Sequence, residues 1–121
     1  MPHLRLETNL PADKIPADFV VKATDVIAES LGKPASYCVV SVIPNLPMAF
    51  GGSTNPCAIA TLMSIGALGV KENKNHSAAI SKLVSEVLGI PNDRMYIHFI
   101  NAGAADVGFK GITFHDIFGG R

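Results

Sequence analysis

The chain has 121 residues, enough for one domain spanning 1–121 with a modest hydrophobic core. It has 10 Lys and Arg against 10 Asp and Glu, and the basic residues are scattered, which argues against a nucleic-acid-binding surface. No apolar stretch reaches the ~20 residues of a membrane-spanning helix, and charges interrupt the N-terminal segment. We therefore expect a cytoplasmic protein with no signal peptide and no membrane insertion.

The first notable residue is Pro2, directly behind the initiator methionine. Removal of Met1 would leave a secondary amine, and an α-amino group has a pKa near ~7.7–8.0. Burial or a nearby cation lowers this pKa. The amine would then be neutral at pH 7 and able to accept a proton from a carbon acid. A proline at this position is also common in proteins where it has no chemical role.

Strands and helices alternate along the rest of the chain. Apolar periodicity predicts helices from about Pro16 to Leu31 and from about Asn73 to Leu88. Each helix ends at a glycine, Gly32 or Gly89, and a proline follows two residues later. Short apolar runs predict four strands: Leu4–Thr8, Cys38–Ile43, Thr61–Ile65 and Met95–Ile100.

The chain also repeats itself. The segment Glu29-Ser-Leu-Gly-Lys-Pro34 aligns with Glu86-Val-Leu-Gly-Ile-Pro91 at an offset of 57 residues, and the same offset pairs the predicted strands. We infer two β-α-β halves, about 2–57 and 58–114, followed by a tail at 115–121. Right-handed crossovers place both helices, antiparallel, on one face of a four-stranded mixed sheet. The predicted fold is α+β.

The other face of this sheet is predicted to be buried as well. The strands around Ile59 and Val39 carry apolar side chains on both faces, which is typical of strands covered on both sides. One layer of helices leaves a large apolar surface exposed in a monomer. We therefore expect an obligate oligomer with its sheets facing inward. Cys38 and Cys57 lie in apolar runs and are expected to be buried thiols.

The motifs of this chain together resemble the macrophage migration inhibitory factor family of the tautomerase superfamily, and are closer to that branch than to D-dopachrome tautomerase. The resemblance implies a homotrimer with active sites at subunit interfaces. It also implies cofactor-free keto–enol tautomerase activity on phenylpyruvate-like and dopachrome-like substrates, and a cytokine role that involves secretion without a signal peptide and a cell-surface receptor. The matching segments are Pro2, Thr8–Pro11, Leu31–Pro34, Met48–Ser53, Asn55–Cys57, Ser64–Gly66, Asp93–Arg94, Tyr96–Ile97 and Val107–Gly108.

Proton transfer between carbon and oxygen requires a base, a group that balances the enolate charge, and an apolar pocket for an aryl group. Pro2 is the predicted catalytic base. Lys33 is the predicted cation, which would meet a substrate carboxylate and lower the pKa of the Pro2 amine. Lys33 could instead be a solvated lysine at a helix C-terminus.

Tyr96 is implied to come from the neighbouring subunit and to donate its hydroxyl to the substrate, although it could be only a half-buried strand tyrosine. His98 shares its face of the strand. Relatives commonly have asparagine at that position, so a structural role for this histidine is equally open. The other implied substrate-binding residues are Ser64, Ile65, Val107 and Phe114, while packing is the simpler explanation for Phe50.

Two features limit the resemblance. Cys57-Ala-Ile-Ala60 lacks the second cysteine of a Cys-x-x-Cys motif, so a dithiol activity has no residues to support it. The tail at 115–121 extends past the usual end of the family and could cover the pocket or be disordered. The four histidines do not have metal-ligand spacing, and no phosphate-binding motif is present, so no metal or cofactor is expected.

An alternative function is a signalling ligand whose tautomerase pocket is vestigial.

Overall fold

The computed structural model describes residues 1–120. Its centre is a four-stranded mixed sheet in the order β2-β1-β3-β4. The strands are β1 (His3–Thr8), β2 (Val39–Ile43), β3 (Ala58–Ser64) and β4 (Met95–Asn101). β1 pairs in parallel with β2 and β3 in parallel with β4, while β1 and β3 are antiparallel. The predicted duplication of a β-α-β unit accounts for this arrangement, and the α+β fold is confirmed.

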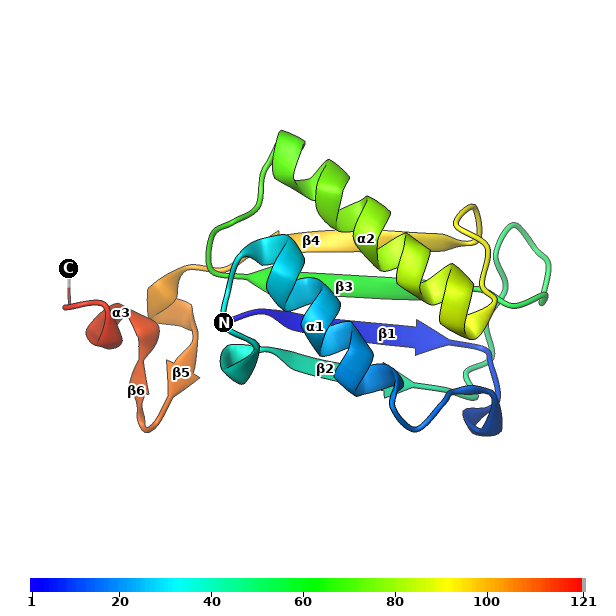
Figure 1. Ribbon diagram of the computed structural model, residues 1–121, viewed down its shortest axis with the longest axis horizontal. Coiled ribbons are helices and arrows are strands. Elements are labelled where there is room, and N and C mark those ends of the chain that lie inside the picture. The colour runs from blue at the N-terminus through cyan, green and yellow to red at the C-terminus, as the bar shows by residue number, and fades with distance from the viewer. Residues whose placement is uncertain (121) are drawn as a thin grey trace.

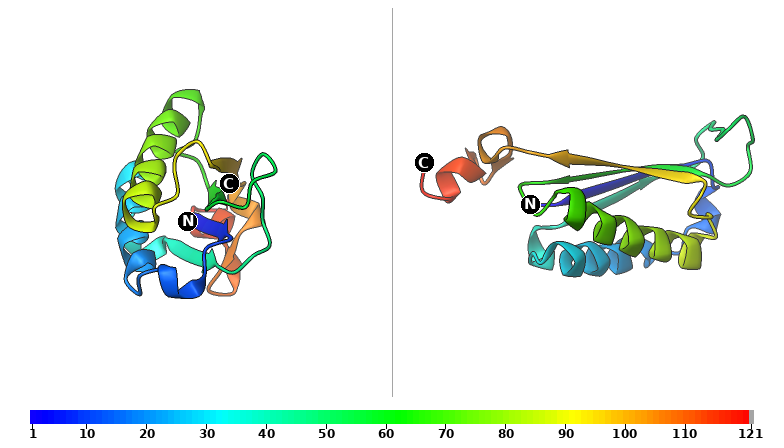
Figure 2. Two further views of the ribbon diagram at one scale, coloured as in Figure 1. Left: turned by 90° about the vertical axis from the view of Figure 1, so that its right-hand side faces the viewer. Right: turned by 90° about the horizontal axis from the view of Figure 1, so that it is seen from above.

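The two crossover helices, α1 (Phe19–Leu31) and α2 (Val70–Leu88), cover one face of the sheet. They run in opposite directions across it (Figure 1), and seen from above they form a single layer beneath the strands (Figure 2). The core lies between these layers. Its fully buried side chains include Leu4 and Leu6 from β1, Phe19 and Ile27 from α1, and Ile80 from α2.

Both helices end where the sequence predicts but begin elsewhere. Gly32 and Gly89 adopt the left-handed conformation at the two C-termini, with φ of 65° and 70°. α1 begins at Phe19 rather than Pro16 because the Phe19 amide donates to the Pro16 carbonyl in a preceding turn (3.0 Å). α2 begins at Val70 rather than Asn73. The Asn73 side chain reaches back and accepts a hydrogen bond from the Gly69 amide (3.3 Å), which stabilises the additional turn.

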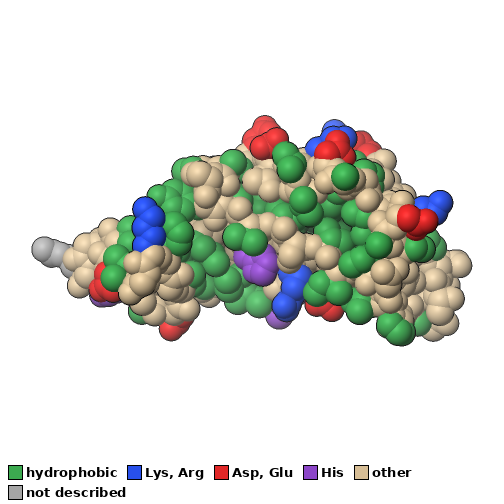
Figure 3. Space-filling model, turned by 90° about the horizontal axis from the view of Figure 1, so that it is seen from below, with side chains coloured by type: hydrophobic (Ala, Val, Ile, Leu, Met, Phe, Trp, Pro, Cys, Tyr) green, Lys and Arg blue, Asp and Glu red, His purple; other side chains and the backbone are tan. Residues whose placement is uncertain are grey.

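The face of the sheet opposite the helices is uncovered in the single chain. Val39, Ile43, Ile59 and Ile100 point to this face and are 39–54% exposed. The face is not uniformly apolar, however. Its central row is polar, because the strand register places Ser41, Arg5, Thr61 and His98 side by side. Seen from below, where β2 is the edge strand, hydrophobic side chains extend along the molecule, and histidine lies beside a Lys or Arg side chain near the middle (Figure 3).

A small C-terminal unit extends beyond the end of the sheet (Figure 1). It consists of β5 (Gly108–Phe109), β6 (Ile112–Thr113) and α3 (Phe114–Ile117). The Thr113 hydroxyl accepts from the Asp116 amide and the Asp116 carboxylate accepts from the Thr113 amide, which forms a capping box. The first residues of the predicted tail therefore continue α3, while Arg121 lies outside the described residues. In residues 1–120, no helix is long and apolar enough to cross a membrane.

Candidate functional site

The start of β1 lies at the end of the sheet that faces the C-terminal unit. Pro2 is buried there, and its carbonyl accepts a hydrogen bond from the Val39 amide (3.0 Å), which anchors the N-terminus to the edge strand β2. While Met1 is attached, the Pro2 nitrogen is an amide without basicity. Removal of Met1 would convert the same nitrogen into a secondary amine.

A cavity of about 240 Å³ opens beside the N-terminus, between the start of β2 and the C-terminal unit. Its walls are largely apolar and aromatic, and Phe109 and Phe114 stack nearly parallel at 5.6 Å between ring centroids. The Tyr37 ring meets Phe109 edge-on at 5.9 Å. The lining residues are Met1, Ser36, Tyr37, Cys38, Val39, Val107, Gly108, Phe109 and Phe114. Such a cavity suits a small aryl group.

Lys33 reaches this end of the sheet from the C-terminus of α1. It directly follows the Gly32 cap, and its Nζ donates to the Ile65 carbonyl at 2.6 Å. Ser64 is fully buried and lies one position beyond the His3–Met63 pair, which places it opposite Pro2 in the antiparallel register. The Ser64 Oγ has no hydrogen-bond partner among residues 1–120. The structure thus brings Pro2, Lys33, Ser64 and Ile65 together.

The surroundings of the N-terminus favour the neutral form of its α-amino group. Burial lowers the pKa of the Met1 α-amino group below its ordinary value, and the Lys33 ammonium lowers it further. The pKa of the Cys38 thiol is raised, chiefly by burial, although the amine and Lys33 act in the opposite direction. Lys33 therefore lies close enough to the N-terminus to influence its protonation.

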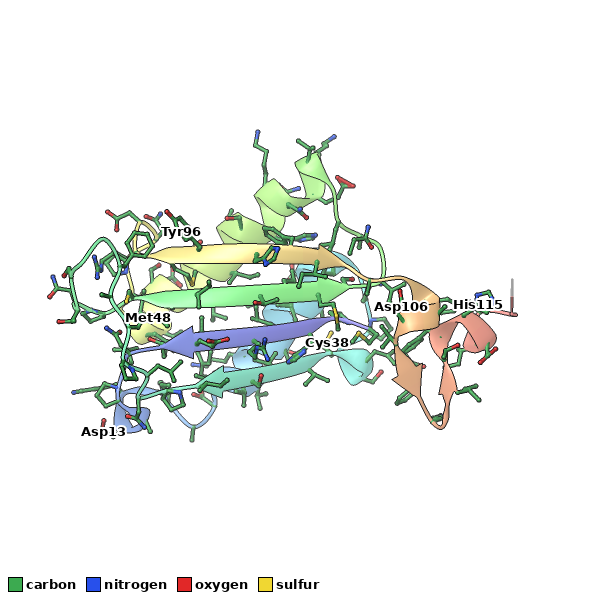
Figure 4. The ribbon with its side chains drawn as sticks, turned by 180° about the vertical axis from the view of Figure 1, so that it is seen from behind. Asp13, Cys38, Met48, Tyr96, Asp106 and His115 are labelled. Atoms are coloured by element: carbon green, nitrogen blue, oxygen red, sulfur yellow. The ribbon has the colours of Figure 1, made fainter. Side chains whose placement is uncertain are left out.

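Tyr96 and His98 do not join this group in the single chain. Tyr96 lies at the first residues of β4, at the opposite end of the sheet from Cys38 (Figure 4). His98 is exposed in the polar central row, opposite Thr61. Of the predicted substrate-binding residues, Val107 and Phe114 line the cavity beside the N-terminus.

Tyr96 belongs to a second cavity of about 370 Å³. Its ring lies 5.0 Å from that of Phe50, and the Arg94 guanidinium lies over Phe50 at 5.6 Å from the ring centroid. The Phe50 ring thus packs on Tyr96 and joins the loop after β2 to that residue. The lining residues are Met48, Ala49, Phe50, Gly51, Ala58, Ile59 and Tyr96.

Two wider grooves, of about 710 and 500 Å³, lie over the helices. They are open to solvent and contain none of the predicted site residues. Polar and charged side chains such as Lys82 and Asn73 contribute much of their lining. Shallow polar grooves of this kind are poorly suited to small apolar ligands, so the candidate site is the smaller cavity at the N-terminus.

The lining residues that the sequence-based prediction missed include Tyr37, Cys38 and Phe109. Cys38 was expected to be buried, and that expectation is wrong, because its thiol is only partly covered and lines the cavity. Cys57 is buried as expected. Phe109 directly follows the Val107-Gly108 motif, so the neighbouring aromatic residue was the available signal. Tyr37 comes beside the N-terminus through the parallel pairing of β1 and β2, and its ring contacts with Phe109 and Phe114 depend on the packing of the C-terminal unit.

Comparisons with known proteins agree with this architecture. The family model "Macrophage migration inhibitory factor (MIF)" matches residues 1–115. A macrophage migration inhibitory factor homolog of Trichinella spiralis is 43% identical over 114 residues, which are 94% of this chain and 100% of that protein. Macrophage migration inhibitory factor of Rattus norvegicus is 40% identical over 94% of this chain and 99% of that protein.

Solved structures are similar too. The structure of the factor from Trichinella spiralis has a TM-score of 0.90 at 43% identity and covers 93% of this chain and 99% of that one. The homologue from Prochlorococcus marinus has a TM-score of 0.86 at 33% identity over 93% and 98% of the two chains. Fold, motif order and nearly complete coverage lead to one conclusion: this chain belongs to the macrophage migration inhibitory factor family, within the tautomerase superfamily.

Proposed function

We propose that this protein is a cofactor-free keto–enol tautomerase of phenylpyruvate-like and dopachrome-like substrates, with Pro2 as its base after removal of Met1. The observation that carries the proposal is the position of the N-terminus. Pro2 is buried beside an apolar cavity, and the adjoining α-amino group has a pKa lowered by burial and by Lys33. This is the environment that a secondary amine needs in order to accept a proton at neutral pH.

In the proposed reaction, the Pro2 amine removes a proton from the carbon next to the keto group. The electron pair of that C–H bond forms the C=C bond of the enolate, and the carbonyl oxygen gains the negative charge. That oxygen then takes a proton from the protonated Pro2 amine, directly or through water, which restores the base. No atoms are lost or gained, so neither an oxidant nor a cofactor is required. Lys33 would pair with the substrate carboxylate, while the Ser64 hydroxyl and the backbone of Ile65 offer polar contacts.

The active form in this proposal is a homotrimer. The exposed apolar side chains on the open face of the sheet support association, because covering them removes a large apolar surface from water. A neighbouring copy would bring Tyr96 and His98 to the Pro2 cavity, which a single chain cannot do. In this arrangement the Tyr96 hydroxyl would donate a hydrogen bond to the substrate oxygen.

The alternative proposal is a signalling ligand. It draws support from the 40% identity to macrophage migration inhibitory factor of Rattus norvegicus. In that case the trimer surface would bind a cell-surface receptor, the pocket would be vestigial, and the protein would be cytoplasmic and secreted without a signal peptide. The two roles make different demands on Pro2, because only the enzyme needs a free secondary amine.

The test is Pro2→Gly, compared with a variant that carries one residue inserted between Met1 and Pro2. Mass spectrometry first establishes that Met1 is absent from the wild-type protein. We expect enolisation of phenylpyruvate to fall by roughly 10²-fold or more in both variants, with an unchanged trimer in sedimentation equilibrium. Activity within about threefold of wild type in a processed variant would refute Pro2 as the base. A processed wild-type protein without activity would favour the signalling ligand.

A further inference from the structure

The turn that joins β3 to α2 has an unfavourable backbone conformation. Gly66 has a φ of 75° and Ala67 a φ of 60°, so two consecutive residues are left-handed. Glycine adopts this conformation freely, but in alanine the Cβ atom approaches the following carbonyl oxygen. Such a conformation persists only where the surrounding structure holds it in place.

His76, on the first turns of α2, holds this turn. It is 3% exposed, and its Nε2 lies 2.8 Å from the Ala67 carbonyl oxygen. Because a carbonyl oxygen can only accept, Nε2 carries the proton. In the neutral ring Nδ1 is then an acceptor, and the Ser30 hydroxyl of α1 lies 2.6 Å from it. One buried imidazole therefore connects the turn to both helices.

The same turn determines where Lys33 lies. The Ile65 carbonyl, at the beginning of the turn, accepts the hydrogen bond from Lys33 Nζ. The backbone of Lys33 is fixed separately, since its amide donates to the Ala28 carbonyl (3.0 Å) at the end of α1. Ser30, which bonds to His76, belongs to this last turn of α1. Both the backbone of Lys33 and the acceptor for its ammonium are thus linked to the imidazole.

We propose that His76 is a positioning residue, which fixes the turn at 65–69 so that the Ile65 carbonyl holds the Lys33 ammonium beside the N-terminal amine. The inference rests on the proposed function only in giving Lys33 a role at that amine. The turn has a second support in the Asn101 side chain, which accepts from the Gly66 amide (3.1 Å). Loss of His76 is therefore expected to shift the turn rather than unfold the protein.

The test uses His76→Asn and His76→Gln, two neutral amides of different length. The Gln amide reaches the position of Nε2 and can still donate to Ala67, whereas the Asn amide ends near Nδ1. The pKa of the N-terminal amine is measured by NMR on Met1-free protein with labelled proline. We expect His76→Asn to raise this pKa, His76→Gln to leave it close to wild type, and Lys33→Ala to raise it at least as much as His76→Asn.

Two further measurements make the test specific. In the Lys33→Ala background, His76→Asn is expected to cause no additional pKa shift, because the group that His76 positions is gone. With phenylpyruvate, His76→Asn is expected to reduce kcat/KM by roughly ten- to a hundredfold, and His76→Gln to restore most of it.

An unchanged amine pKa in folded His76→Asn overturns the inference, as does an equal shift in His76→Gln or an additive shift in the double variant. An amine pKa that Lys33→Ala leaves unchanged overturns it too. These outcomes are independent of catalysis. If processed wild-type protein does not enolise phenylpyruvate, the proposed function fails, yet the pKa comparison still decides the role of His76.

Discussion

The two ends of the central sheet are built differently. At the N-terminal end, Pro2 and Ser64 are buried, Lys33 points to the turn after β3, and the nearby cavity is closed by the C-terminal unit. At the opposite end, Tyr96 is 69% exposed, and its ring packs on Phe50 of a long loop. One end holds the proposed base, Pro2, and a lysine in a largely apolar setting, and the other presents an unburied tyrosine.

The comparison teaches that the predicted site residues are divided between the two ends. Tyr96 is not among the residues that line the N-terminal cavity, whose hydroxyl groups are those of Ser36 and Tyr37, and the Tyr96 cavity is lined by neither an amine nor a lysine. Because the sheet separates them, no side-chain motion within one chain can join them. The proposed active site therefore requires a second copy, and the open face of the sheet provides the surface through which copies would meet.

The strongest test of this comparison is complementation between two inactive variants. Pro2→Gly and Tyr96→Ala are each expected to lose most of the enolisation activity. The two variants are then mixed in equal amounts and refolded together. If each site combines Pro2 of one copy with Tyr96 of another, random assembly restores intact sites to about one quarter of the total. Enolisation assays before and after mixing measure this recovery.

Sedimentation equilibrium at micromolar concentration provides the control, since recovery requires an assembly. No recovery from folded trimers would mean that both residues act within one chain or that Tyr96 has no role. A stable folded monomer would contradict the proposed burial of the open sheet face. A dimer would exclude the trimer but keep the shared site.

A smaller effect is expected from Lys33→Ala, which alters only the N-terminal end. Burial is the main cause of the lowered pKa of the Met1 amine and the Lys33 ammonium is the second. We expect the same two causes to act on the Pro2 amine after processing, so that removal of the ammonium raises its pKa without restoring the ordinary value. A base works only when unprotonated, so the acid limb of the pH profile of kcat/KM should move to higher pH.

The same variant should bind carboxylate substrates more weakly, and an ester substrate separates the two effects. With the ester, the KM change should largely vanish while the shift of the acid limb remains. If both the acid limb and the carboxylate KM stay at wild-type values, Lys33 is only a solvated residue at a helix end.

The smallest effect is expected from Arg94→Lys, at the Tyr96 end. Arg94 donates to the carbonyls of Phe50, Pro56, Ser53 and Asn55, and a lysine cannot reproduce this planar set of donors. The loop that carries Phe50 should loosen and Tyr96 should lose its ring contact. We expect KM for phenylpyruvate to rise by about two- to fivefold, with an unchanged pKa of the N-terminal amine.

An altered amine pKa in Arg94→Lys would show that the two ends are coupled within one chain, contrary to the comparison. An unchanged KM would mean that the loop does not control the position of Tyr96. NMR titration of the amine and steady-state kinetics on the same sample distinguish these outcomes.

The sequence alone predicted the fold well, because its signals are local. Apolar periodicity, the glycines after each helix and the offset of 57 residues are all readable without tertiary contacts, and they lead to the duplicated β-α-β unit. The helix starts were displaced by three residues, since a turn at Pro16 and the side chain of Asn73 decide them. Half of the candidate site was also predictable, because Pro2 and the segments around Lys33 and Ile65 match family motifs.

Only the tertiary structure decided how these residues are divided in space. His76 is buried on α2, and its bonds to Ser30 and Ala67 depend on how α1 and α2 meet. Cys38, Tyr37 and Phe109 converge because the C-terminal unit folds back toward the N-terminus. Tyr96 lies far from Pro2 because it stands near the start of β4, and the seven residues of this strand separate it from the end of the sheet that carries Pro2. Local sequence determines elements, whereas contacts between distant segments determine which side chains meet.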